Sequence, residues 1–257
     1  MRPESNIEPI GTTTRRYPRI LAYPTAKTTE VLGGFRFPDP PERKPDDMTS
    51  FEHLTRTGSV HHLIRHLGNP ETTLVAGERY VSLRTTRNMA GVKCLDLLIA
   101  FDVDPVTYHR RNAYVISEQG KPPDFVLEIA SRSTGSEGTG EKRDVYAAMG
   151  IPEYWRFDET GEFHGVHLAG DRLVNGVYEP IQIDQLSEGT YQGHSEVLDL
   201  NIRWHDGQLE WYNPETGLHI PTFDDERARA DEERAGRLEA EARVHELEEE
   251  LRRLRGS

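Results

Sequence analysis

The chain has 257 residues, of which 35% are hydrophobic and 29% charged, and its formal net charge is −13. This length is enough for one substantial domain or two small ones. So acidic a chain is not expected to coat nucleic acid non-specifically, because phosphate contacts need a basic surface; a local basic cleft is still compatible with it.

No apolar run reaches the roughly 18 residues that span a membrane, and the amino terminus lacks the apolar segment of a signal peptide. We therefore expect a soluble, cytoplasmic protein without membrane contacts. The single cysteine, Cys94, has apolar neighbours. A buried, reduced thiol is favoured there over a nucleophile, and zinc–cysteine sites are excluded.

Residues 1–46 contain eight of the sixteen prolines and little periodicity, so we expect an extended amino-terminal arm. Residues 47–222 are expected to form the globular domain. Its first helix is predicted to begin at the capping box Thr49–Glu52 and to end near Leu67.

His62 and His66 on this helix have a spacing that can ligate a metal. No acid or third ligand accompanies them, so we interpret them as residues of the polar face of the helix.

Strands are predicted after Pro70. TTLVAGERYVSL is expected to turn at Ala76-Gly77, whereas VKCLDLLIAF and FVLEIAS are each expected to form one buried strand, with a polar connection rich in turn formers between them. After a loop, EKRDVYAAM is predicted to be a helix that ends at Gly150, and EYWRF is a further strand. This order indicates an α/β domain with a mixed sheet flanked by helices.

From His164 to Pro221, short apolar runs alternate with turn residues and predict additional β-hairpins, in which Gly165 to His167 are expected to be strand residues. Residues 223–257 differ in composition and are predicted to be a charged helical tail. Alternating spacings of four and three form a coiled-coil seam of about two heptads, made of Ala240, Val244, Leu247, Leu251 and Leu254. Self-association through this seam and a solvated tail are both compatible with the sequence.

Two of the buried strands contain an acid in their interior, Asp96 in KCLDLLIAF and Glu128 in FVLEIAS. Neither alternates onto an evidently solvated face, and an unpaired buried carboxylate is costly. If the strands are neighbours, the two acids converge and suit a hard divalent cation such as Mg²⁺. Lys142, on the following helix, would complete a site for phosphodiester hydrolysis.

A different interpretation is that Asp96 and Glu128 pair with arginines or accept hydrogen bonds from backbone amides at strand ends. Asp124, directly after two prolines, is explained as a turn and strand-start residue.

The span from Val75 to Asp158 resembles the family of Uma-type restriction endonucleases, which have the PD-(D/E)xK nuclease fold. Four stretches carry the resemblance: VAGERYVSL, VKCLDLLIAF, PPDFVLEIASRST and EKRDVYAAMGIPEYWRFD. The resemblance implies a restriction-endonuclease-like mixed sheet flanked by helices, with a nuclease site that uses Mg²⁺ or Mn²⁺.

By position, Asp96 matches the acid of the family's PD motif and Glu128 the acid of its D/E-x-K motif. The resemblance implies that both bind the metal, with the backbone carbonyl of Ile129 as a further ligand. Ala130 stands where the motif has its lysine, and Lys142 from the next helix would replace it.

The chain departs from the family at three positions. Leu95 replaces the proline before the first acid, Arg132 replaces a proline after the second strand, and Gly138, next to Glu137, stands where an aspartate is common. The last two changes concern the loop that leads to Lys142.

Three functions follow as hypotheses. The first is a Mg²⁺- or Mn²⁺-dependent endonuclease acting on DNA, with a homodimer as a means of cutting both strands. The second is a non-catalytic binding or assembly module that keeps the fold and joins partners through its tail. The third is a metal-dependent phosphoesterase acting on another substrate through the same site.

Overall fold

The computed structural model describes residues 34–40, 59–130, 139–221 and 223–255. The predicted capping box Thr49–Glu52, the two loop departures at Arg132 and Gly138, and most of the predicted arm lie outside the described residues.

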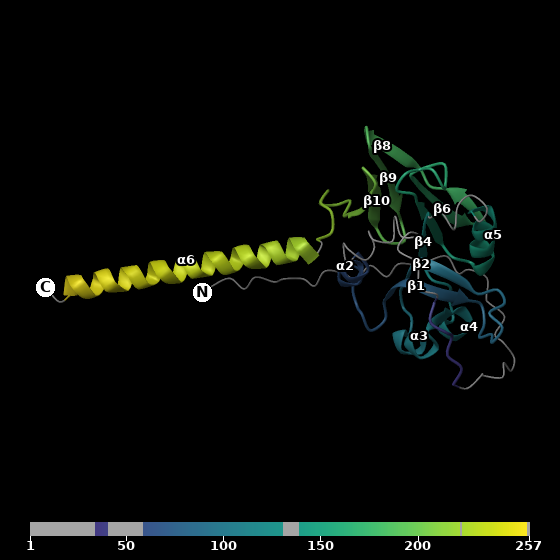
Figure 1. Ribbon diagram of the computed structural model, residues 1–257, viewed down its shortest axis with the longest axis horizontal. Helices are drawn as coiled ribbons and strands as arrows, with labels where there is room; N and C mark the ends of the chain where they lie inside the picture. Colours follow the sequence, from purple (N-terminus) through teal and green to yellow (C-terminus); the bar gives the residue numbers. More distant parts are fainter. Residues whose placement is uncertain (1–33, 41–58, 131–138, 222, 256–257) are drawn as a thin grey trace, which may run out of the picture. The chain divides into compact units, whose positions relative to one another are not determined.

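A central sheet of seven strands has the order β3-β1-β2-β4-β5-β6-β7 (Figure 1). β1 and β3 are parallel, as are β4 and β5, whereas the other neighbours are antiparallel. The predicted mixed sheet is therefore confirmed. Its strands are β1 (Leu74–Ser82), β2 (Lys93–Ala100), β3 (Ala113–Val115), β4 (Phe125–Ile129), β5 (Glu153–Phe157), β6 (Leu168–Val174) and β7 (Val177–Pro180).

A second sheet of four antiparallel strands has the order β11-β10-β9-β8, which confirms the predicted hairpins. Its strands are β8 (Ile183–Ser187), β9 (Thr190–Ser195), β10 (Leu200–His205) and β11 (Gln208–Tyr212). The described helices are α2 (Ser59–His66), α3 (Pro105–Arg111), α4 (Ile116–Gln119), α5 (Thr139–Met149) and α6 (Phe223–Arg255). Among the described residues, no helix combines the length and apolar character needed to cross a membrane.

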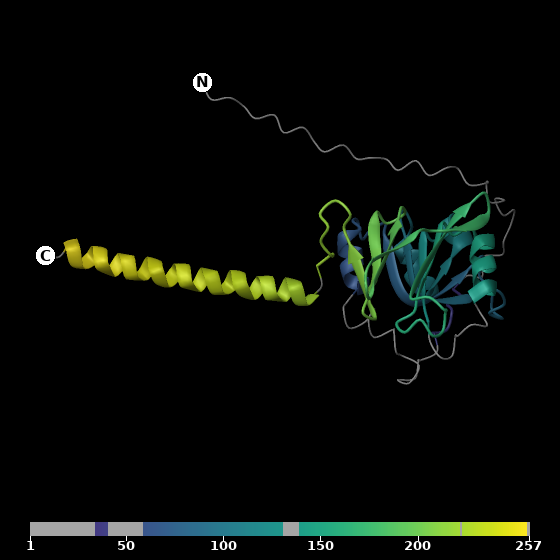
Figure 2. The same ribbon diagram turned by 90° about the horizontal axis from the view of Figure 1, so that it is seen from above.

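The central sheet is buried on both faces. On one face Leu97, Leu127 and Trp155 pack with apolar residues of the second sheet and of α2. On the other, Leu98 and Val126 pack with residues that include Tyr146 of α5, so α5 and the second sheet cover opposite faces (Figure 2). This double cover explains why the β2 and β4 sequences are almost continuously apolar.

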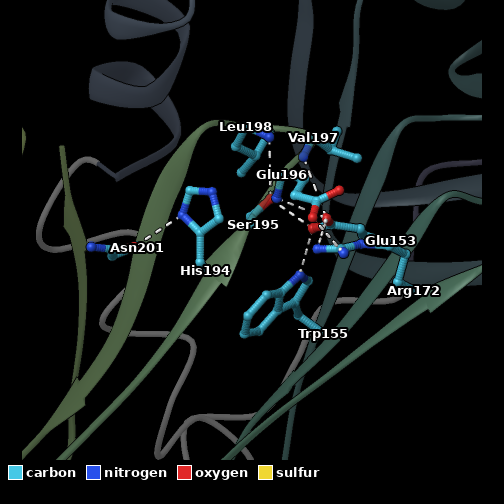
Figure 3. A network of polar contacts seen from close by, with 9 residues as sticks. All are labelled: Glu153, Trp155, Arg172, His194, Ser195, Glu196, Val197, Leu198 and Asn201. Carbon is cyan, nitrogen blue, oxygen red and sulfur yellow. Dashed lines mark hydrogen bonds and ion pairs between the residues drawn. The ribbon is translucent and has the colours of Figure 1, made fainter. Parts of the chain in front are cut away.

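Figure 3 shows a buried carboxylate, that of Glu153 at the start of β5, where the two sheets meet. It accepts hydrogen bonds from Trp155 Nε1 (3.0 Å), Ser195 Oγ (2.6 Å) and the backbone N–H groups of Glu196 (3.0 Å) and Val197 (3.3 Å). Arg172 Nη2 lies 3.6 Å from the same carboxylate. These donors account for a charge with no exposed surface.

Two predictions about the strands are wrong. There is no turn at Ala76-Gly77, because β1 continues through it and pairs with β2 along its length, with Gly77 opposite Leu97. Gly165 to His167 precede β6 and are not strand residues. The His167 ring instead stacks on Trp204, with 3.9 Å between the ring centroids.

The connection between β2 and β4 is also more ordered than predicted, since it forms α3, β3 and α4. Asp104 caps α3 by accepting a hydrogen bond from the backbone N–H of Val106 (2.9 Å), and Asn112 ends the helix in the left-handed conformation. The Asp104-Pro105 pair is a helix-start signal, which the turn-forming composition of the segment obscured.

Two predictions of burial need correction. His62 is buried, not on a polar face, because its side of α2 packs on the sheet. Cys94 is only partly buried.

Candidate active site

The two interior acids face each other across neighbouring strands. β2 and β4 are antiparallel, and Leu97 pairs with Leu127, so one further step of this register brings Asp96 opposite Glu128. Directly opposed residues have Cβ atoms about 5 Å apart. Both side chains are almost fully buried, with exposed fractions of 2% for Asp96 and 4% for Glu128. The predicted convergence of the two carboxylates is thus confirmed.

Glu128 is held from α5. Its Oε2 lies 2.7 Å from Lys142 Nζ, and its Oε1 accepts a hydrogen bond of 2.5 Å from the hydroxyl of Tyr146. Lys142 and Tyr146 are one helical turn apart and therefore share a face of α5. The lysine side chain is one-quarter exposed, so solvent reaches this side of the site.

Asp96 is held by the backbone, since its Oδ2 accepts a hydrogen bond of 2.6 Å from the N–H of Ile129. The interpretation that these acids bond backbone amides is correct for Asp96. No arginine pairs with Glu128 among the described residues; a lysine and a tyrosine do. The role of the Ile129 carbonyl as a metal ligand stays a prediction.

The electrostatic environment of the site disfavours ionisation of Glu128. Burial, followed by the charge of Asp96, raises the pKa of Glu128 to about 7, and Lys142 and the Tyr146 hydrogen bond oppose this rise. Burial, together with the nearby Glu128, also raises the pKa of Tyr146, which stays a phenol and a hydrogen-bond donor. A cation between the acids would reduce their repulsion and so oppose the rise in the pKa of Glu128.

The donor set fits a hard divalent ion. Among the described residues, no group of three or more His, Cys, Asp and Glu side chains could hold a metal. An ion at this site would take two carboxylates and complete its coordination with backbone oxygen and water, as Mg²⁺ commonly does. Asp96 and Glu128 would be its side-chain ligands.

Arg143, the residue after Lys142, attaches α5 to the central sheet. Arg143 Nη2 donates to the carbonyl of Tyr178 (2.6 Å) and to Asp171 Oδ1 (3.1 Å). Arg156 of β5 donates to the other oxygen of Asp171 (2.9 Å). The helix that presents Lys142 is therefore attached to β6 and β7, and through Asp171 also to β5.

Sequence reasoning missed two residues of this region, Tyr146 and His164. The four-residue spacing from Lys142 could have identified Tyr146. His164 lies in the β5–β6 loop, where Asp158 accepts a hydrogen bond from its backbone N–H (2.7 Å). Burial lowers its pKa, with Asp158 opposing and Arg156 and Lys142 adding to the effect. No local sequence signal points to it.

Asp124 is confirmed as scaffolding, because its carboxylate accepts hydrogen bonds from the Phe101 backbone N–H (2.8 Å) and from Lys121 Nζ (2.6 Å). A hollow of about 430 Å³ is lined by β6, β7, β9 and β10 residues such as Arg172, Glu179 and His194. Its lining does not include Asp96, Glu128 or Lys142, which we call the acid–lysine cluster.

The fold and the cluster together define a restriction-endonuclease-like α/β domain with a buried acid pair and a lysine. A family model described as "Uma2: Putative restriction endonuclease" matches residues 96–222. The chain therefore has a domain that matches the Uma2 family, and the matched residues run from Asp96 within β2 through the second sheet. They overlap the span from Val75 to Asp158 that resembles the family and continue beyond it.

A solved structure is also similar. It is a crystal structure described as a putative nuclease belonging to DUF820, from Anabaena variabilis. Its sequence is 10% identical, the TM-score is 0.36, and the match covers 58% of this chain and 76% of the other. No curated protein matches the chain.

Proposed function

We propose that this protein is a Mg²⁺- or Mn²⁺-dependent endonuclease that hydrolyses DNA phosphodiester bonds. The observation that carries the proposal is the meeting of Asp96, Glu128 and Lys142, with the lysine ammonium 2.7 Å from the glutamate. A family of restriction endonucleases supplies the reaction class. The site's own chemistry, two oxygen donors and one cation, suits a phosphate ester.

Each side chain has a distinct role in this proposal. Asp96 and Glu128 hold the ion, which when bound supplies Lewis acidity and an activated water. Lys142 presents its ammonium where negative charge develops on the scissile phosphate, or orients the attacking water. Tyr146 is a positioning residue, because its hydroxyl fixes one oxygen of Glu128 and leaves the other toward Lys142.

A basic loop beside the site supports DNA as the substrate. The β1–β2 hairpin carries Arg84, Arg87 and Lys93, and no acid occurs between Arg79 and Leu95 in this otherwise acidic chain. Arg84 and Arg87 are exposed and make no ion pair in the described part of the chain. Lys93 Nζ lies 3.3 Å from Glu141 in the first turn of α5.

The hairpin and the helix that carries Lys142 therefore meet at one end of the sheet. Exposed guanidinium groups there are free to contact phosphates of a strand that reaches the site.

The test is cleavage of supercoiled plasmid with Mg²⁺ or Mn²⁺ and with EDTA. We expect nicking or cutting only with the ion, and a loss of about a hundredfold or more for Glu128→Gln and Lys142→Met. Glu215→Gln, the same change at an exposed turn, is the matched control and should cleave normally. Cleavage by Glu128→Gln at the normal rate would contradict the proposal. Cleavage of model phosphoesters but not of DNA would favour the phosphoesterase.

One observation favours the non-catalytic module as a second candidate. Lys142 and Tyr146 already donate to both oxygens of Glu128 without an ion, which is the arrangement that a purely structural cluster needs. Calorimetric titration with Mn²⁺ separates the two functions. Stoichiometric binding that Asp96→Asn abolishes supports the nuclease, and no binding supports the module.

A further inference from the structure

The carboxy-terminal helix α6 exposes a stripe of large apolar side chains. It is one continuous helix, Phe223–Arg255, interrupted neither at Gly236 nor in its charged first half. The exposed fractions are 56% for Val244, 45% for Leu247, 51% for Leu251 and 69% for Leu254. Stripes of this kind on an otherwise charged helix are typical of helix–helix interfaces.

The spacing of the stripe indicates how a partner helix would pack against it. Val244 and Leu251 occupy position a of a seven-residue repeat, and Ala240, Leu247 and Leu254 occupy position d. This 3.5-residue period keeps one seam facing a partner helix in a left-handed supercoil. Val244, the β-branched residue at one of the two a positions, favours two strands in combination with leucine at d.

The flanking charges fit a second copy of the same helix. Arg243 and Glu250 occupy position g, whereas Glu248 and Arg255 occupy position e. In a parallel, in-register pair, each g residue faces the e residue five positions further along the other helix. Arg243 would then meet Glu248, and Glu250 would meet Arg255, so both kinds of contact join opposite charges.

The same heptad assignment shows where the interface ends on its amino-terminal side. Continued backward, positions a and d fall on Arg237, Glu233, Ala230, Glu226 and Phe223, three of which are charged, and Arg229 would face Arg234 across the pair. Like charges at these positions disfavour pairing. The association is therefore confined to about residues 240–254 and is expected to be weak and dependent on concentration.

We propose that α6 pairs with α6 of a second copy of this chain, as a parallel two-stranded coiled coil over residues 240–254. This interface is independent of the acid–lysine cluster. It would bring two Uma2-family domains onto one assembly.

Sedimentation equilibrium of the full chain, from micromolar to submillimolar concentration, tests the proposal. We expect a monomer–dimer equilibrium whose dissociation constant rises about tenfold or more in Leu247→Glu, because each copy loses a buried leucine. Leu238→Glu makes the same change at an exposed leucine in the outward position b, on the amino-terminal side of the proposed interface, and is the matched control; it should leave the equilibrium nearly unchanged. A monomer at every concentration, or equal effects of the two changes, would overturn the proposal.

A charge exchange tests the alignment. Arg243→Glu alone should weaken the dimer, because two glutamates would then face each other. Adding Glu248→Arg to the same chain should restore it, since the pair is re-formed with the charges exchanged. If the double variant associates more weakly than the single one, the parallel in-register alignment is wrong.

Discussion

Glu128 is expected to make the stability of this protein fall as the pH rises from about 4.5 to about 7. In the folded protein the pKa of Glu128 is about 7, against an ordinary value of 4.5. Below pH 4.5 the carboxyl group is protonated in both the folded and the unfolded state, so it costs nothing. Between pH 4.5 and pH 7 only the unfolded chain ionises, and unfolding becomes easier. Above pH 7 both states are ionised, and the cost stays constant.

The size of this effect follows from the two pKa values. At about 1.4 kcal/mol for each pKa unit, the full cost is about 3 kcal/mol. Glu128→Gln keeps the shape of the side chain and cannot ionise. The variant should therefore gain about 2 to 3 kcal/mol relative to the natural chain between pH 5 and pH 8.

Urea denaturation in EDTA at pH 5, 6, 7 and 8 measures the free energy of unfolding of both proteins. Glu215→Gln controls for the loss of one acid from the surface. A stability difference between the Glu128 variant and the natural chain that stays constant over this range would refute the raised pKa of Glu128.

Three further changes test other contacts. Tyr146→Phe removes the hydroxyl bonded to Glu128 and should cost about 1 to 3 kcal/mol, more at pH 8 than at pH 5, because the ionised carboxylate needs that donor most; urea denaturation at both pH values checks it. Glu153→Ala leaves four buried donors without their acceptor and should cost about 3 to 5 kcal/mol. If the Glu153 variant had the same thermal unfolding temperature as the natural chain, Glu153 would not stabilise the contact between the two sheets. Arg84→Ala and Arg87→Ala should each lower the slope of log affinity for DNA against log salt by about 0.9, measured by fluorescence anisotropy in EDTA; unchanged slopes would remove the hairpin from the DNA surface.

The sequence was most informative where a local pattern coincides with a tertiary constraint. The apolar runs of β2 and β4 predicted two buried strands, and an acid inside each predicted a site, because burial of a lone carboxylate is too costly to be accidental. That the two strands are neighbours followed only from resemblance to a family. Pairing between strands 30 residues apart in sequence has no local signal.

The failures have physical causes too. Ala76-Gly77 has turn composition, but pairing of β1 with β2 on both sides of it outweighs local preference. The segment that contains α3 was read by its polar composition, although Asp104-Pro105 marks a helix start. His164 reaches the neighbourhood of the site through a loop whose shape depends on Asp158, which no spacing rule describes.

The attachment of α5 through Arg143 has a consequence for residues outside the cluster itself. Lys142 lies on a helix that is anchored to β6 and β7, so these strands help to fix the position of its ammonium group. A change at Arg143 or Asp171 can therefore alter the cluster without removing any of its side chains.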